Sequence, residues 1–332
     1  MKIQDILTLL RSLAPEENQS SWDNSGVQVA GVAEETAKVA VCLEPTPEMV
    51  ERCLEWGAGV VVTHHPLYMK PKPLSAEGMF LDVVRLTVGR GAWLYAAHTS
   101  LDTRPGGPAF WLGQELGLVA SRLLEPEHRR TPIEASFFCE KPIDRATATI
   151  WADNPRIHSV SQTQAGEVRI VCDEAGWSDI AGSIEFSLGT RPLFYLRPMT
   201  APVDVVGFGE VGELPKPMEF EAFAARLAEL TGLSGFSVAG PKPDTVAKVA
   251  YCGGSGASLV DAAADAGADV FVTGDMKYHP AVEARTCVVD VGHFAYEEEM
   301  MRRFAGELSA ALADAEVAFF TGTNPFWRYE AE

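Results

Sequence analysis

Histidine and carboxylate side chains gather directly after short apolar segments of this sequence. Four of the seven histidines and three acidic residues stand at such positions: His64, His65, His98, His293, Asp102, Asp275 and Glu297. Imidazoles and carboxylates without thiolates suit Zn, Fe, Mn or Co better than a closed structural zinc site. Vicinal imidazoles at a strand end diverge, so His64 and His65 fit two adjacent ions better than one.

Two divalent ions, of unassigned identity, are therefore predicted, with Asp102 and Glu297 as oxygen ligands. A carboxylate can bridge two such ions at a separation of about 3.5–4 Å. The simpler interpretation is that a strand-end histidine is a hydrogen-bonded polar residue and that His-x3-Asp is a capping or packing pair. Three separate segments that each end in histidine or carboxylate favour the metal centre.

Three other motifs are less specific. The turn CGGSGAS (252–258) could hold an anion, but it matches neither the dinucleotide fingerprint nor the P-loop, so close strand–helix packing is favoured. The segment WDNSG (22–26) is explained equally well as a functional loop or as cap and turn chemistry. No His–Asp arrangement beside Ser100 or Ser255 can be read from the sequence, which disfavours serine hydrolysis.

The segments that carry the candidate residues belong to an internal repeat. Residues 37–63 and 247–273 align without a gap at an offset of 210 and share 11 identities in 27 positions, far more than chance gives. Each copy is typical of an apolar strand, a helix that ends at Gly57 or Gly267, and a second apolar strand. This pattern predicts a duplicated strand–helix–strand unit in a mainly parallel sheet.

The repeat continues into a third apolar segment in each copy. Residues 92–97 lead to His98 and Asp102, and residues 286–291 lead to His293 and Glu297. Ligands of such sheets bind beyond the C-terminal ends of the strands, which is where these side chains stand. The predicted fold class is α/β, with two duplicated halves of mainly parallel sheet and a small α+β insertion between them.

The chain is expected to divide into three parts. Residues 1–125 form the first α/β half, and residues 201–332 form the second half, which completes the dinuclear site. Residues 126–200 contain short apolar stretches between polar turns and form the predicted insertion. Further helices and a last strand are predicted at residues 1–15, Glu77–Gly89, Glu219–Leu230, Tyr296–Leu312 and 316–320.

Charge and composition narrow the class of protein. Lys and Arg number 27 against 46 Asp and Glu, a net charge of −19, which repels nucleic acid and anionic membranes at long range. The sequence shows no signal peptide, no apolar run of transmembrane length and no CxxC among its six cysteines. We expect a cytoplasmic protein with buried reduced thiols and no membrane partner, and a nucleic-acid partner is disfavoured.

Several motifs together resemble the Nif-three-like family, whose members are also catalogued as GTP cyclohydrolase 1 type 2 homologues. They are THHP (63–66), HTSLD (98–102), GEVGELPKPM (209–218), YCGGSGASL (251–259), VTGDMKYH (272–279), GHFAYE (292–297) and WDNSGVQV (22–29). The resemblance covers residues 1–125 and 203–330. It implies two similar α/β halves around a dinuclear metal centre, and a toroidal homohexamer. Carried over by position, the ligands are His64, His65, Asp102, His293 and the bridging Glu297, with His98 a near neighbour.

Two functional hypotheses follow from the residues and the resemblance. In the first, the protein is a dinuclear-metal-dependent hydrolase, similar to a GTP cyclohydrolase of type 2, that acts on an unassigned small molecule. His98 or Asp275 would then move protons. In the second, it is a non-catalytic metal-binding regulatory or adaptor ring whose insertion binds a ligand or partner. A ring that threads DNA is least favoured because of the acidic charge balance.

Overall fold

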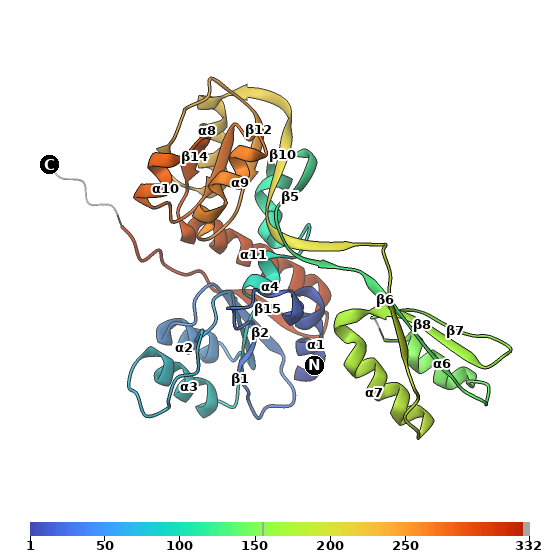
Figure 1. Ribbon diagram of the computed structural model, residues 1–332. Coiled ribbons are helices and arrows are strands. Elements are labelled where there is room, and N and C mark those ends of the chain that lie inside the picture. Colours follow the sequence, from blue (N-terminus) through green and yellow to red (C-terminus); the bar gives the residue numbers. More distant parts are fainter. Residues whose placement is uncertain (155, 328–332) are drawn as a thin grey trace. The chain divides into compact units, whose positions relative to one another are not determined.

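The computed structural model describes residues 1–154 and 156–327, which form two compact units (Figure 1). The larger unit comprises Met1–Glu127 and Val206–Glu332, and the smaller unit comprises His128–Val205. Both segments that flank the smaller unit therefore fold together. The separate domains at 1–125, 126–200 and 201–332 stay a prediction.

The first sheet of the larger unit has five strands in the order β1-β4-β3-β2-β15. Strands β2 (Lys38–Cys42), β3 (Val60–Thr63) and β4 (Trp93–Ala96) are parallel to one another. On the two edges, β15 (Glu316–Phe319) runs parallel to β2, and β1 (Gly26–Val29) runs antiparallel to β4. All four residues of β3 are buried, as expected where helices cover both faces of a parallel sheet.

The second sheet has six strands in the order β11-β14-β13-β12-β10-β5. Its bounds are β5 (Val119–Arg130), β10 (Asp204–Glu219), β11 (Ser237–Ala239), β12 (Thr245–Tyr251), β13 (Val270–Thr273) and β14 (Cys287–Asp290). Strands β12, β13 and β14 are parallel, and β11 is antiparallel to β14. The four strands β11-β14-β13-β12 thus repeat the order and directions of β1-β4-β3-β2.

The helices of the larger unit cover both sheets. They are α1 (Ile3–Leu13), α2 (Pro47–Glu55), α3 (Met79–Gly89), α4 (Thr99–Asp102), α5 (Trp111–Leu116), α8 (Phe220–Thr231), α9 (Val260–Asp265), α10 (Tyr278–Glu283) and α11 (His293–Ala311). The long helix α11 runs between the two sheets (Figure 1), and its Met301 and Phe304 share one buried cluster with Val41 of β2 and Val272 of β13. This shared core joins the two sheets.

The outer face of each sheet has a core of its own. Val50 of α2 packs with Val61 of the first sheet, and Ala263 of α9 packs with Phe271 of the second. A local N-cap fixes the start of α2, because the Thr46 side chain accepts a hydrogen bond from the Met49 backbone N–H. The chain after α2 and α9 turns at glycines with positive φ, as the sequence predicted.

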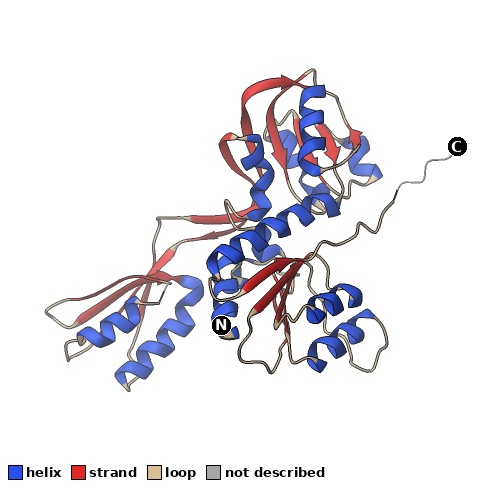
Figure 2. Cartoon of the chain, turned by 180° about the vertical axis from the view of Figure 1, so that it is seen from behind, coloured by secondary structure: helices blue, strands red, loops and turns tan. Residues whose placement is uncertain are grey.

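The smaller unit is a four-stranded antiparallel sheet with two helices on one face (Figure 2). Its elements follow in the order β6 (Pro132–Phe138), α6 (Arg145–Ala152), β7 (Ile157–Gln162), β8 (Glu167–Asp173), α7 (Trp177–Leu188) and β9 (Tyr195–Pro198). Trp151 and Ile180 of the helices pack on Phe137 and Ile170 of the sheet. The sheet order β7-β8-β6-β9 with this connectivity is a split βαβ, or ferredoxin-like, arrangement.

The structure confirms the α/β fold class with an α+β insertion and corrects some element bounds. The last long helix begins at His293, not at Tyr296. Gly292 precedes it with a φ of 77°, and its backbone N–H donates to Asp290 Oδ1, so the helix can start directly after the strand. Within residues 1–154 and 156–327, no helix combines the length and apolar character that crossing a membrane requires.

Candidate metal centre

The candidate residues stand at strand ends and helix starts of the larger unit. His64 and His65 follow β3, His98 precedes α4 after β4, and His293 begins α11 after β14. The earlier start of α11 puts His293 and Glu297 in one helix at positions i and i+4, on the same face. The structure thus brings together the imidazoles and carboxylates that the sequence placed far apart.

Glu297 lies at the centre of this cluster. Its Oε1 lies 3.6 Å from His64 Nε2, and its Oε2 lies 3.1 Å from His65 Nε2 and 2.8 Å from His293 Nε2. Asp102 Oδ1 lies 3.7 Å from His64 Nε2. The two oxygens of one carboxylate therefore face different nitrogen donors, which is the arrangement expected of a bridging ligand.

Each of four imidazoles engages its Nδ1 outside this cluster. The partners are Ala97 O for His64 (2.8 Å), Glu44 for His65 (2.6 Å), Asp23 for His98 (2.7 Å) and Asp275 for His293 (2.8 Å). A partner of this kind fixes the tautomer and the ring orientation of a metal-binding histidine and leaves Nε2 available. Ligand atoms of His64, His65 and His98 lie within 4.8 Å of one another, as do those of His65, His293 and Glu297.

Two atoms at the centre of the cluster lack a hydrogen bond. His64 Nε2 and Glu297 Oε2 are buried without such a bond in the described part of the chain, although Glu297 Oε2 is at ion-pair distance from two imidazoles. Leaving buried polar atoms unsatisfied costs free energy. A cation bound among these atoms would satisfy both, so the donor set fits a metal ion.

The carboxylates raise the pKa of two imidazoles. Burial opposes the protonation of His65, but the adjacent Glu297 and Glu44 outweigh it and raise the pKa of His65 to about 10. Burial likewise opposes the protonation of His293, but Glu297 and Asp275 raise its pKa to about 9. In the metal-free protein, the carboxylates therefore favour the protonated form of each ring, while the two rings, whose Nε2 atoms lie 3.2 Å apart, oppose each other's protonation.

The two acids respond to the cluster in opposite directions. Burial would raise the pKa of Glu297, but the surrounding imidazoles, first His64, hold it well below the ordinary value. For Asp102, burial dominates and raises the pKa to about 6, because His64 compensates only in part and Glu297 adds repulsion. Glu297 is thus the firmly ionised acid of the pair.

The Gly-rich turn after β12 lets the strand approach α11 closely. A Cβ on Gly254, whose φ is +61°, would lie 2.2 Å from Glu297 Oε1, and one on Gly253 would lie 2.4 Å from the ring of Tyr296. Close packing, which the sequence favoured over anion binding for this turn, agrees with these distances. The turn therefore leaves room for the Glu297 carboxylate to face the imidazoles.

Asp275 and His98, predicted to move protons, lie on different sides of the imidazoles. Asp275 has a left-handed φ of 55° and contacts His293 at Nδ1, opposite the cluster nitrogen. His98 lies with its ring centroid 5.1 Å from that of His64 and 5.5 Å from that of His65. His98 is therefore near enough to act as a ligand as well as a proton carrier, whereas Asp275 has the geometry of a positioning residue.

Sequence analysis did not assign two carboxylates of the site. Glu44 directly follows the first repeat strand, so the strand-end rule that selected His64 and His98 could also have selected it. Asp23 lies in the WDNSG segment, whose functional role was left open. Its fully buried carboxylate accepts hydrogen bonds from His98, Thr99 and the Asn24 backbone N–H, and these, with His98 first, hold its pKa far below the usual range despite burial.

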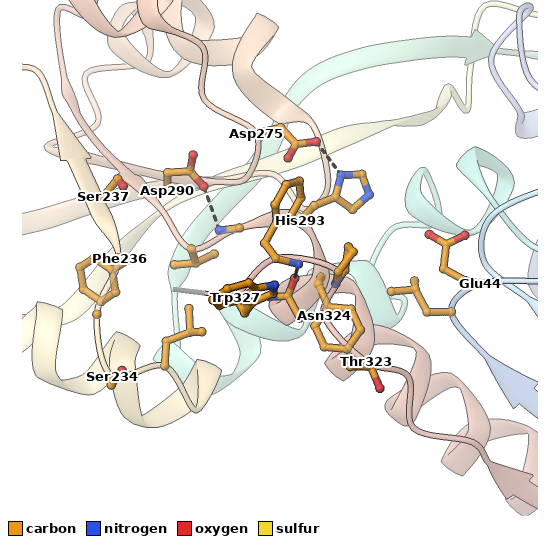
Figure 3. Close-up of a pocket in the computed structure, with 18 of the residues that line it drawn as sticks. Glu44, Ser234, Phe236, Ser237, Asp275, Asp290, His293, Thr323, Asn324 and Trp327 are labelled. Atoms are coloured by element: carbon orange, nitrogen blue, oxygen red, sulfur yellow. Dashed lines mark hydrogen bonds and ion pairs between the residues drawn. The ribbon is translucent and has the colours of Figure 1, made fainter. Parts of the chain in front are cut away.

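A pocket of about 840 Å³ opens beside His65 and His293 (Figure 3). Its lining includes the acids Glu44, Asp275 and Asp290, and the aromatic residues Phe236, Phe294, Phe326 and Trp327. In Figure 3, Glu44 and Phe236 stand at opposite ends of this pocket. Its volume is within the range of small-molecule sites, so a ligand could reach the candidate ions from this side.

The fold and the site define an α/β protein with His/carboxylate clusters that could bind metal. The sequence profile of the DUF34/NIF3 family (NGG1p interacting factor 3) matches residues 1–325, so the chain belongs to this family. A Staphylococcus aureus relative named GTP cyclohydrolase 1 type 2 homolog is 27% identical over 340 residues, 91% of each chain. A Streptomyces coelicolor relative of the same name is 28% identical over 303 residues, 89% of this chain and 81% of that one.

A solved structure supports the fold. The crystal structure of a Bacillus cereus protein related to NIF3 superposes with a TM-score of 0.81 and covers 99% of both chains at 23% sequence identity. Identity at this level establishes the common fold alone.

Proposed function

We propose that this protein binds two divalent metal ions and uses them in a hydrolytic reaction on a small molecule. The observation that carries the proposal is the pairing of the imidazoles. Four rings are anchored through Nδ1, and at least three of them direct Nε2 to the two oxygens of Glu297. An ordinary hydrogen-bonded histidine cluster does not require so many rings in one orientation.

The proposed ligands form two sets that share one residue. One ion would be held by His64, Asp102 and Glu297 Oε1, and the other by His65, His293 and Glu297 Oε2. Asp102 and Glu297 are the oxygen donors, and neutral Nε2 atoms are the nitrogen donors. The donor set contains no thiolate, which suits Zn, Fe, Mn or Co.

Bound ions of this kind polarise a substrate oxygen and lower the pKa of a water towards neutrality. The residues of this chain supply the proton transfers. His98 donates through Nδ1 to the ionised Asp23, so its other nitrogen can accept a proton while Asp23 stabilises the resulting imidazolium. Asp275 orients His293 and lines the pocket, where it can exchange a proton with a bound molecule.

The name of the curated relatives includes GTP, so GTP is one of the compounds to be tested for binding and turnover. The resemblance implies a toroidal homohexamer in the cytoplasm, and this assembly belongs to the proposal. Sedimentation of the metal-loaded and metal-free protein tests the assembly, because a hexamer predicts a mass six times that of the 35.9 kDa chain. A monomer under both conditions would contradict it.

Metal analysis of anaerobically purified protein tests the proposed centre directly. Wild type should retain about two ions per chain, and the double variant His64→Ala/Glu297→Ala should retain less than about half an ion. His158→Ala is the matched control, because His158 is an exposed histidine paired with Asp173 in the smaller unit. Equal metal content in all three proteins would refute the assignment.

Turnover assays distinguish a metal-dependent hydrolase from a protein that only binds metal. Metal-loaded wild type and the double variant are incubated with nucleotides, phosphoesters and cyclic amides. Activity present in wild type and His158→Ala, but absent from the double variant, supports catalysis at this site. No turnover above the double variant for any compound would remove the enzymatic part of the proposal and leave the metal-binding part.

A regulatory or adaptor role is the second candidate, and the smaller unit favours it. This unit is compact by itself and exposes large apolar side chains, among them Phe138, Ile150, Phe186 and Leu193. Where such side chains are contiguous, they mark an interaction site. Metal-dependent assembly without turnover would favour this candidate over the hydrolase.

A further inference from the structure

We infer that the pocket beside the candidate metal centre accepts an uncharged or cationic ring compound and discriminates against nucleoside triphosphates. The inference rests on the proposed function and names the class of substrate for the same site. Two properties of the lining carry it: the sign of its charge and its aromatic side chains.

When the His65 and His293 imidazoles are neutral, as metal ligands must be, the charged side chains that line the pocket are all acidic. Glu44, Asp275 and Asp290 contribute to the wall, and none of the described lining residues is Lys or Arg. These acids are fixed in place, because Asp290 accepts backbone hydrogen bonds from Met276 and Gly292 while the other two hold histidines. Apart from the proposed ions, the described wall of the metal-loaded pocket therefore offers a polyphosphate no cationic partner.

Binding of the proposed ions does not make the net charge of the site positive. Two divalent ions bring four positive charges, and six carboxylates oppose them: Asp23, Asp102, Glu297, Glu44, Asp275 and Asp290. With neutral imidazoles the net charge of the site is about −2. A single phosphoryl oxygen could bind an ion, but the rest of a triphosphate would extend along an acidic wall, where like charges repel it.

The aromatic side chains indicate what the pocket accepts. Phe326 and Trp327 are 81% and 79% exposed, which is unusual for residues of this size, and Phe236 and Phe294 line the same space. Aromatic faces stack on planar rings and attract cations through their quadrupole. Asn324 helps to fix the backbone at Phe326, because its side-chain oxygen accepts a hydrogen bond from the Phe326 backbone N–H at 2.9 Å.

Two cationic residues have to be included in the test, Lys72 because of its position in the structure and Arg328 because of its place in the sequence. Lys72 lines an adjacent cavity that shares Glu44 and Thr46 with the pocket. Arg328 directly follows the last described residue, Trp327. If either residue recruits phosphate, its replacement by alanine will weaken GTP binding.

Calorimetry with guanosine and GTP tests the inference, because the two probes share a base and differ in charge. Zinc-loaded protein at an ionic strength of about 20 mM should bind guanosine at least about 10-fold more tightly than GTP, and 0.5 M salt should narrow the difference. Tryptamine provides the cationic ring and should bind at least as tightly as guanosine. Lys72→Ala and Arg328→Ala should leave the ratio unchanged.

The complementary experiment introduces lysine side chains into the lining of the pocket. Ser234→Lys/Ser237→Lys places cations at two exposed lining positions and should tighten GTP binding about 10-fold with little effect on guanosine. Ser309→Lys, at an exposed position on α11, is the matched control. Trp327→Ala should weaken guanosine and tryptamine about 5-fold or more without loss of metal, since stacking on an aromatic ring is lost.

The outcomes separate this inference from the proposed function. GTP binding as tight as guanosine, or loss of GTP binding in Lys72→Ala or Arg328→Ala, would overturn the charge selection while metal content stays intact. Failure of both guanosine and tryptamine to bind would overturn the ring class. Failure of the wild-type protein to retain zinc would instead refute the proposed function.

Discussion

The two repeated strand ends of the larger unit have the same backbone plan and different chemistry. Strand β3 ends at Thr63 and is followed by His64-His65, whereas β13 ends at the aligned Thr273 and is followed by Gly274-Asp275. A Cβ on Gly274 would lie 2.7 Å from both Gly254 O and His293 N, so this position accommodates only glycine. The first copy therefore supplies two imidazoles, whereas the second supplies Asp275, which orients the His293 imidazole at the start of α11.

After the third strand of each copy, the second copy carries an acidic side chain that is one methylene group longer than that of the first. His98 and Asp102 in the first copy correspond to His293 and Glu297 in the second. The longer Glu297 reaches three imidazoles, whereas Asp102 lies 3.7 Å from His64 alone. The two copies thus share the same strand order and directions, but the candidate metal ligands at their strand ends differ.

Removing the bridging carboxylate gives the largest expected effect. Glu297→Gln should weaken binding of both ions by more than the roughly 10–100-fold that loss of an outer partner costs. Asp102→Asn should weaken mainly the ion beside His64. Titration with Zn²⁺ against a chelator measures both constants, and equal losses in the two variants would contradict the asymmetry between the copies.

Metal affinity should rise with pH. A ligand imidazole must be neutral, and the metal-free protein holds protons on His65 and His293 up to about pH 10 and pH 9. Displacing both protons gives up to about a 100-fold gain per pH unit below these values. The same shifts stabilise the metal-free fold below the unfolded histidine pKa of 6.5, and this stabilisation is lost as pH rises through 9–10.

Competition titrations between pH 6 and 8.5 measure this dependence. Glu44→Gln removes one of the charges that raise the pKa of His65, so the slope should become shallower. His158→Ala should keep the wild-type slope. A flat profile in wild type would show that the rings are already neutral and would contradict the charge balance described for the cluster.

The orienting carboxylates provide a matched comparison of the two copies. Asp275→Asn, Glu44→Gln and Asp23→Asn each remove one charge that holds Nδ1 of an imidazole. The first two should weaken metal binding about 10–100-fold. Asp23→Asn should have a smaller effect on binding and a larger one on the pH profile of any turnover, because His98 is the proposed proton carrier.

Gly254→Ala is expected to have the smallest effect on this scale. The residue has a left-handed φ, which costs about 1–2 kcal/mol for alanine, and the added Cβ would press on Glu297 Oε1. Gly267→Ala is the control, since its φ is also positive but no atom lies within 4 Å of the added Cβ. Thermal unfolding should show a loss in both variants, and metal analysis a loss only in Gly254→Ala.

The sequence predicted the framework because its signals are local. Continuous apolar runs such as VVVT, with helices that end at glycines, predict parallel strands and connecting helices wherever they occur. The α/β class and the parallel strands were read correctly for this reason. The start of α11 was missed because Gly292 and Asp290 act through backbone geometry, which composition does not reveal.

The sequence by itself determined which residue types stand at the strand ends, since strand periodicity and the repeat place them there. Only the tertiary structure decided which of these side chains meet, because pairwise distances between residues 200 positions apart depend on the packing of α11 between the sheets. It also decided that Glu44 and Asp23 belong to the site, since a carboxylate that orients an imidazole needs one close contact and no fixed spacing in the chain.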